Sequence, residues 1–101
     1  MTLEDFNNIV DSYGLYKMKY NPLSGFFDKA SWAIPVLTFQ EATGKLTIYV
    51  SLSDDGKMSY NTKHIIVSEV STANYFLKRL FKQRKKILVD KKLKEINRDF
   101  A

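Results

Sequence analysis

Residues 46–53 alternate strictly between apolar and polar side chains, a period of two that is typical of an extended strand with one buried face. Asp54-Asp55-Gly56 follows directly, and an Asp-Gly pair supplies the positive φ angles that tight hairpin turns need. Met58 and Tyr60 then alternate with polar residues. Residues 46–64 therefore predict an antiparallel hairpin whose inward-facing side chains are Leu46, Ile48, Val50 and Leu52.

A first strand is predicted at residues 16–20, where tyrosine and methionine alternate with Lys17 and Lys19. Asn21-Pro22 is expected to end this strand, and residues 21–31 are predicted to form a loop. Phe26, Phe27 and Trp32 form an aromatic cluster around this loop. Such a cluster either closes the end of a core or anchors a protein partner, and the first interpretation is favoured.

The segment between this loop and the hairpin, residues 32–40, is apolar on both faces, which favours a central strand. Pro35 inside the segment favours an edge strand or a bulge instead, because proline cannot donate a hydrogen bond to a sheet. Both placements stay open. Residues 41–44 form a turn into the hairpin, and Ile65-Ile66-Val67 extends its last strand.

Helices are predicted at both ends of this strand-rich region. Thr2 and Asp5 have the spacing of a capping box, and Gly14 is placed to end the first helix in a left-handed conformation. Its apolar face consists of Leu3, Phe6, Ile9, Val10 and Tyr13. Ser71 or Thr72 is expected to cap the last helix, whose apolar arc comprises Ala73, Phe76, Leu77, Leu80, Phe81, Ile87 and Leu88.

These elements predict a small α+β domain with the order α-β-β-β-β-α, in which two helices flank an antiparallel meander sheet. A chain of 101 residues has about the usual size of one hydrophobic core, so we expect a single domain over residues 1–101. Residues 89–101 are expected either to protrude or to pack separately. Acidic Glu4 and Asp5 do not suit an export signal, so we expect a cytoplasmic protein with no membrane span.

Enzymatic chemistry has no recognisable set of residues in this chain, so we expect neither catalytic nor cofactor-binding residues. The absence of cysteine excludes thiolate metal sites and thiol nucleophiles. His64 is the single histidine, whereas zinc sites need three or four nitrogen or sulfur ligands. We therefore expect a non-enzymatic protein without a metal or cofactor.

Positive charge is concentrated in the last quarter of the chain. Residues 78–101 hold ten Lys and Arg against three Asp and Glu, whereas residues 1–77 hold six against eight. Such a cluster favours a polyanion or an acidic protein surface as partner, although it is also typical of a solvated helix face. The candidate binding residues on the last helix are Lys78, Arg79, Lys82, Lys85, Lys86 and Tyr75.

A second set of candidates lies on the polar face of the predicted sheet. A tyrosine among lysines resembles a platform that stacks bases and contacts phosphates, although antiparallel sheets ordinarily keep one face polar. These candidates are Lys17, Lys19, Tyr49 and Lys63.

The apolar pattern changes its phase near residue 89. Val89, Leu93, Ile96 and Phe100 have four-three-four spacing, but they fall about half a turn from the preceding apolar arc. Either the helix breaks near Asp90 and folds back, or it continues and this stripe associates with a second copy or another protein. Association is favoured, because no glycine or proline supplies a break.

Two functions are consistent with these features. The first is a small nucleic-acid-binding or regulatory protein that contacts DNA or RNA through its lysine-rich helix. The second is a protein-binding module, such as an inhibitor or assembly factor encoded by a phage or plasmid. Such a module would dock on an acidic or nucleic-acid-binding surface of a larger complex. Formation of a homodimer through the stripe is compatible with both functions.

Overall fold

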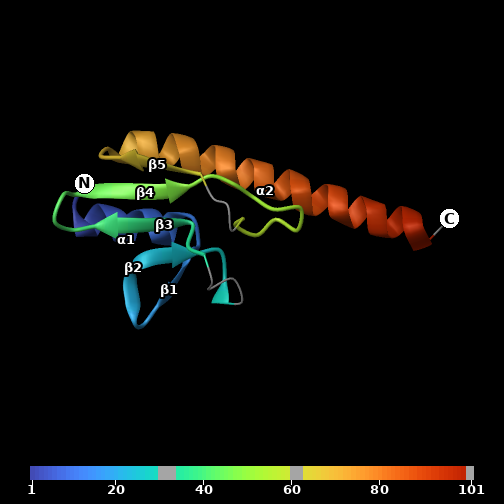
Figure 1. Ribbon diagram of the computed structural model, residues 1–101, viewed down its shortest axis with the longest axis horizontal. Helices are drawn as coiled ribbons and strands as arrows, with labels where there is room; N and C mark the ends of the chain where they lie inside the picture. Colours follow the sequence, from blue (N-terminus) through green and yellow to red (C-terminus); the bar gives the residue numbers. More distant parts are fainter. Residues whose placement is uncertain (30–33, 60–62, 100–101) are drawn as a thin grey trace.

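The computed structural model describes residues 1–29, 34–59 and 63–99, and it describes side chains as far as Ile96. Predictions that concern Trp32, Tyr60 and Phe100 lie outside the described residues. The order of elements is helix α1 (Leu3–Ser12), five strands, and helix α2 (Val70–Asp99), as Figure 1 shows. The strands are β1 (Tyr16–Met18), β2 (Asn21–Phe26), β3 (Leu37–Gln40), β4 (Lys45–Tyr49) and β5 (His64–Val67).

The five strands form one antiparallel sheet in which each strand pairs with the next along the chain, β1-β2-β3-β4-β5. The predicted α+β meander with a helix at each end is therefore confirmed, with five strands instead of four. The additional strand is β2, in the segment for which the sequence predicted a loop. Asn21-Pro22 opens this strand, and the chain turns at Lys19-Tyr20.

Two residues of β2 explain why its sequence does not resemble a strand. A side chain at Gly25 would meet Leu37 and Leu15 at 3.2–3.3 Å, so close packing favours glycine here. The hydroxyl of Ser24, which is buried, is hydrogen-bonded to the hydroxyl of Thr38 on β3 at 3.0 Å. Both residues are turn formers by propensity, and packing overrides that propensity.

Strand β3 is central in the sheet, so the first of the two placements that the sequence left open for residues 32–40 is correct. It begins at Leu37, so Pro35 precedes the strand and takes no part in its ladder. The predicted turn at residues 41–44 is confirmed, with Gly44 at a φ of +67°.

The predicted hairpin joins the expected segments across the expected turn, but its ladder is shorter. Strand β4 ends at Tyr49, which pairs with His64, and an isolated pair, Leu52 with Met58, lies nearer the turn. Two residues separate Tyr49 from Leu52, whereas five separate Met58 from His64, so one uninterrupted ladder cannot join the two pairs. The turn itself contains Gly56 at a φ of +80°.

Helix α1 has the predicted capping box: the Asp5 amide donates to the Thr2 hydroxyl at 3.1 Å, and the Thr2 amide donates to Asp5 Oδ2 at 3.0 Å. Gly14 follows the helix at a φ of +62°, also as predicted. Helix α2 begins at Val70, so Ser71 and Thr72 lie inside its first turn instead of capping it.

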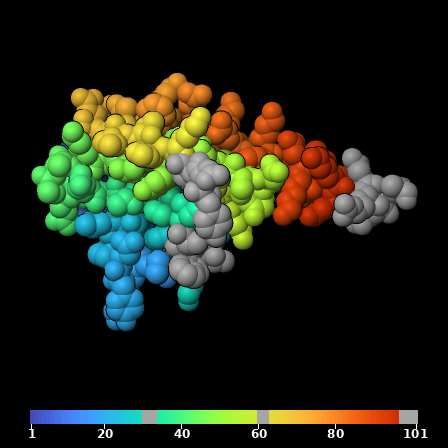
Figure 2. Space-filling model, in the orientation of Figure 1, coloured from blue at the N-terminus to red at the C-terminus, as the bar shows by residue number. Residues whose placement is uncertain are grey.

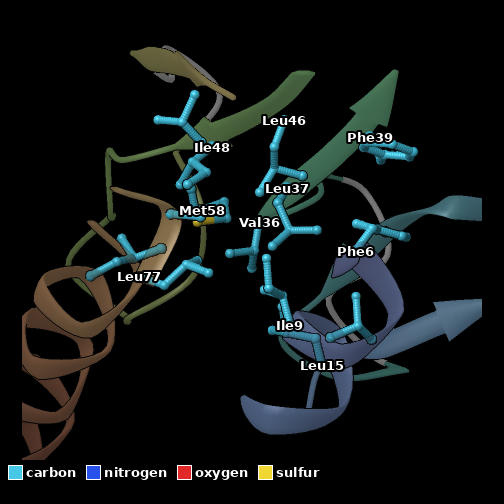
Figure 3. Packing of buried hydrophobic residues seen from close by; sticks show 14 residues of the cluster. Phe6, Ile9, Leu15, Val36, Leu37, Phe39, Leu46, Ile48, Met58 and Leu77 are labelled. Carbon is cyan, nitrogen blue, oxygen red and sulfur yellow. The ribbon is translucent and has the colours of Figure 1, made fainter. Parts of the chain in front are cut away.

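The core lies between one face of the sheet and both helices. Figure 3 shows Ile9 of α1 and Leu77 of α2 pointing toward Leu37, Leu46 and Ile48 of the sheet. The helices also contact each other, because the Tyr13 hydroxyl donates to Asn74 Oδ1 at 3.1 Å and the Tyr13 ring stacks on Phe81. The other face of the sheet carries Thr38, Thr47 and Tyr49.

Helix α2 is continuous through Asp90, so the predicted alternative of a break and fold-back is wrong. Good helix formers on both sides of Asp90, with no glycine or proline, explain the continuity. Thirty residues span about 45 Å, and every described side chain from Leu88 onward is exposed. The last third of the helix therefore extends beyond the body, as Figures 1 and 2 show.

Candidate nucleic-acid interface

The basic candidates on α2 share one exposed side of the helix. Ala73, Leu77 and Leu80 are buried against the sheet, and the opposite side of the same helix faces solvent. Residues 70–89 contain no Asp or Glu, so no carboxylate on this stretch neutralises the basic side chains. We define the basic face as the exposed residues Tyr75, Lys78, Arg79, Lys82, Lys85 and Lys86.

Tyr75 and Arg79 form a pair at the start of the basic face. Arg79 Nη1 donates to the Tyr75 hydroxyl at 3.3 Å, and the guanidinium carbon lies 5.7 Å from the centre of the ring. The Tyr75 ring also meets Phe76 edge to face, with centroids 5.1 Å apart. An exposed tyrosine is thus held in place beside cations, and this combination suits stacking of a base next to a phosphate.

The second half of the basic face surrounds a shallow hollow of about 560 Å³. Lys82, Lys85 and Lys86 line it together with Arg79, and Val89 contributes its apolar end. None of these four cations forms an ion pair with another described residue. Their charges are available to a polyanion, because a Lys ammonium binds phosphate as a point charge.

Arg84 is the basic residue of this region that does not belong to the basic face. Its Nε donates to the Gly56 carbonyl at 3.1 Å, and its Nη2 lies 4.0 Å from Asp28 Oδ2. Its guanidinium also covers the Phe27 ring. Arg84 therefore attaches the 53–58 turn and the end of β2 to α2, and its charge is used within the fold.

The predictions from the sequence did not single out Arg84, although its position in the helix carries a signal for this role. Arg84 falls at about 20° on the helical wheel that places Ala73 at zero, inside the apolar arc. A cation at such a position requires partners within the protein, since burial of an unpaired charge is costly.

The sheet candidates do not join the basic face. Lys17 and Lys19 lie on or beside β1, at the far edge from β5, and four strand spacings amount to about 19 Å. The Lys17 ammonium donates to Asn7 Oδ1 at 2.6 Å and lies 5.9 Å from the Phe6 ring, so it contacts α1. The Lys19 ammonium lies 6.0 Å from the exposed ring of Tyr20.

Tyr49 and Lys63 form a third, separate location. The Tyr49 ring lies 6.0 Å from the His64 ring, on the sheet face that the helices do not cover. Lys63 is exposed beside them. The predicted platform of tyrosine and lysine therefore has its members in two places, both away from the basic face, because the meander keeps sequential strands in order across the sheet.

The described part of the association stripe is exposed along its length. Val89 is 49% exposed, Leu93 53% and Ile96 43%, values typical of side chains on a helix without a partner. These three residues continue the side of α2 that carries the basic face.

Among residues 1–29, 34–59 and 63–99, no three His, Asp or Glu side chains gather as a metal site would require. No described helix has the length and apolar character needed to cross a bilayer. Comparison of the chain with protein-family models, curated proteins and solved structures found no match.

Proposed function

We propose that this protein binds nucleic acid through the basic face of α2. The observation that supports the proposal is the set of five exposed cations on a helical stretch that contains no carboxylate. Residues 78–86 span about 12 Å of helix, comparable to three or four phosphate spacings along one strand. Four of the five cations are lysines, which favour phosphate contacts over the bidentate reading of base edges.

Binding of this kind depends steeply on salt, because each phosphate contact releases a condensed counterion. Five contacts to duplex DNA predict a log–log slope of about −4.5, and five contacts to a single strand predict about −3.5. On duplex DNA the affinity should fall roughly 500-fold between 50 and 200 mM salt.

Fluorescence anisotropy with labelled duplex DNA, single-stranded DNA and duplex RNA over this range of salt tests the proposal. A slope near the stated values, lost on charge reversal of the basic face, supports nucleic-acid binding. Absence of binding to all three probes at 50 mM salt refutes it.

A protein-binding module is the second candidate, and the position of Tyr75 and Val89 at the two ends of the cationic set favours it. Tyrosine and apolar side chains among charges are typical of protein interfaces. In this alternative the protein docks on an acidic or nucleic-acid-binding surface of a larger complex. A partner captured through the basic face after complete nuclease digestion, with no binding to any of the three probes, would favour this function.

A further inference from the structure

The overhanging end of α2 presents an apolar seam, which we define as Val89, Leu93 and Ile96. Each member lies four or three residues from the next, so the three side chains fall on one side of the helix. All three are exposed, and the neighbouring described side chains of residues 90–95 are exposed as well. No other part of the described chain covers the seam.

We propose that the seam binds the same seam of a second copy of this chain, with the two helices antiparallel. Leu93 of each copy then packs against Ile96 of the other, as in a short coiled coil. This pairing does not depend on nucleic-acid binding, because it has its own readouts and shares only Val89 with the hollow beside the basic face.

The overhang leaves room for a second helix. The turn that contains Asp54 and Asp55 lies beside Ile87, Lys91 and Lys94, on a different side of α2 from the seam. Val89, Leu93 and Ile96 are all exposed, so the described part of the body leaves this side of α2 open to an approaching helix.

Repulsion between lysine side chains disfavours a parallel arrangement of the two helices. The spacing that defines the seam continues backward to Lys86 and Lys82, which occupy the same side of the helix. In a parallel pair, each of these lysines would face its own equivalent inside the interface. In the antiparallel pair, the two Lys86 side chains are separated by 17 residues along the axis, about 25 Å, which exceeds the screening length at physiological salt.

Charge also selects the register of the antiparallel pair. If Leu93 packed against Val89, the two Asp90 side chains would flank the symmetry axis together, and so would the two Lys92 side chains. Packing Leu93 against Ile96 instead moves the Lys92 side chains about 8 Å apart along the axis and the Asp90 side chains about 14 Å apart. The proposed register therefore avoids both like-charge pairs.

Sedimentation equilibrium with the full chain tests whether a second copy occupies the seam. We expect a monomer–dimer equilibrium that Leu93→Gln weakens at least tenfold. Glu95→Gln places the same side chain on another side of the overhang and should change the dissociation constant less than twofold. A monomer at 200 µM refutes the proposal, and so does a dimer that Leu93→Gln leaves unchanged. Circular dichroism confirms that both variants keep their helix.

A spin label at Gln83→Cys tests the orientation, because the chain has no other cysteine and Gln83 is exposed outside the seam. The proposed pair separates the two labels by 23 residues along the axis, about 35 Å. Double electron–electron resonance should therefore give a distance of at least about 35 Å. A distance below about 20 Å would show a parallel pair and overturn the proposed arrangement.

Discussion

The guanidinium carbon of Arg84 lies 4.2 Å from the centre of the Phe27 ring. The same ring meets Phe81 edge to face, with centroids 5.5 Å apart, so Phe27 is enclosed by two residues from successive turns of α2. The Arg84 Nε also donates a hydrogen bond to the Gly56 carbonyl. One side chain thereby fixes the position of α2 relative to two loops that lie far apart in the sequence.

Replacement of Arg84 by glutamine should destabilise the fold by about 1–2 kcal/mol, because the change removes a cation–π contact and a charged hydrogen bond at a site that is only 26% exposed. Lys85→Gln removes the same charge from the next, exposed position and should alter the free energy of unfolding by less than about 0.5 kcal/mol. Urea denaturation of both variants measures the difference. Equal effects would show that Arg84 has no anchoring role.

The same two variants should have the opposite ranking in nucleic-acid binding. Lys85→Gln removes a free cation and should reduce the magnitude of the salt slope on duplex DNA by about 0.9. Arg84→Gln removes a charge already engaged within the fold and should leave the slope unchanged. Anisotropy titrations at four salt concentrations determine both slopes. A smaller slope magnitude for Arg84→Gln would place Arg84 in the interface instead.

Charge reversal of Lys78, Lys82, Lys85 and Lys86 to glutamate should abolish nucleic-acid binding while the protein stays folded. All four side chains are exposed, and changes at such positions ordinarily cost about 0.5 kcal/mol or less each. Far-ultraviolet circular dichroism and an anisotropy titration test the two parts. Loss of the helical spectrum would mean that this side of α2 supports the fold.

Gly14 and Gly44 form a matched pair for substitution, because both have φ angles near +65° but different surroundings. A Cβ at Gly14 meets nothing within 4 Å, so Gly14→Ala should cost only the left-handed backbone, about 1–2 kcal/mol. A Cβ at Gly44 would lie 2.8 Å from the Met1 carbonyl oxygen, so Gly44→Ala should cost more. Thermal unfolding that ranked them in the reverse order would contradict the structure around Gly44.

Because of Asp55, the stability of the fold should depend measurably on pH in the acid range. The Ser53 hydroxyl and the Lys57 amide both donate to Asp55 Oδ1 and hold the pKa of this carboxyl below its ordinary value of 3.8. The ionised form therefore stabilises the fold above about pH 4, and this contribution is lost as the pH falls through the lower pKa of the folded state. Ser53→Ala should raise the Asp55 pKa toward 3.8, measured by NMR titration. An unchanged pKa would exclude the hydroxyl as its cause.

Local patterns predicted the elements that local interactions determine. The capping box of Thr2 and Asp5 and the left-handed glycines at positions 14, 44 and 56 are all present, because each feature depends on a few adjacent residues. Strand β2 could not be predicted in this way. Gly25 lies in a strand at a place where a Cβ would come within 3.2–3.3 Å of Leu37 and Leu15, and these crowded contacts join residues distant in the sequence.

Predictions of the candidate site also succeeded where one element determines the outcome and failed where several elements do. Helical periodicity predicted the basic face, since one helix fixes which of its own residues share a side. The predicted grouping of Lys17 and Lys19 with Tyr49 failed, because β1 and β4 are not neighbours in the sheet and because Lys17 contacts α1 on the side opposite to Tyr49. Alternation along a strand specifies which face a side chain occupies but does not specify its neighbours on that face.

The overhang of α2 also affects how the molecule moves through water. Its radius of gyration is 14.9 Å, against about 13 Å for a compact domain of this length, and it measures 55 × 27 × 25 Å. The frictional drag on such a shape exceeds that on a sphere of 11.7 kDa, so a single copy should leave a gel-filtration column early. Tumbling should also be anisotropic: the amide N–H bonds of α2 lie near the long axis and are reoriented by the slow end-over-end motion, whereas cross-strand N–H bonds lie away from that axis. NMR relaxation rates should therefore differ between helix and sheet even where both are rigid.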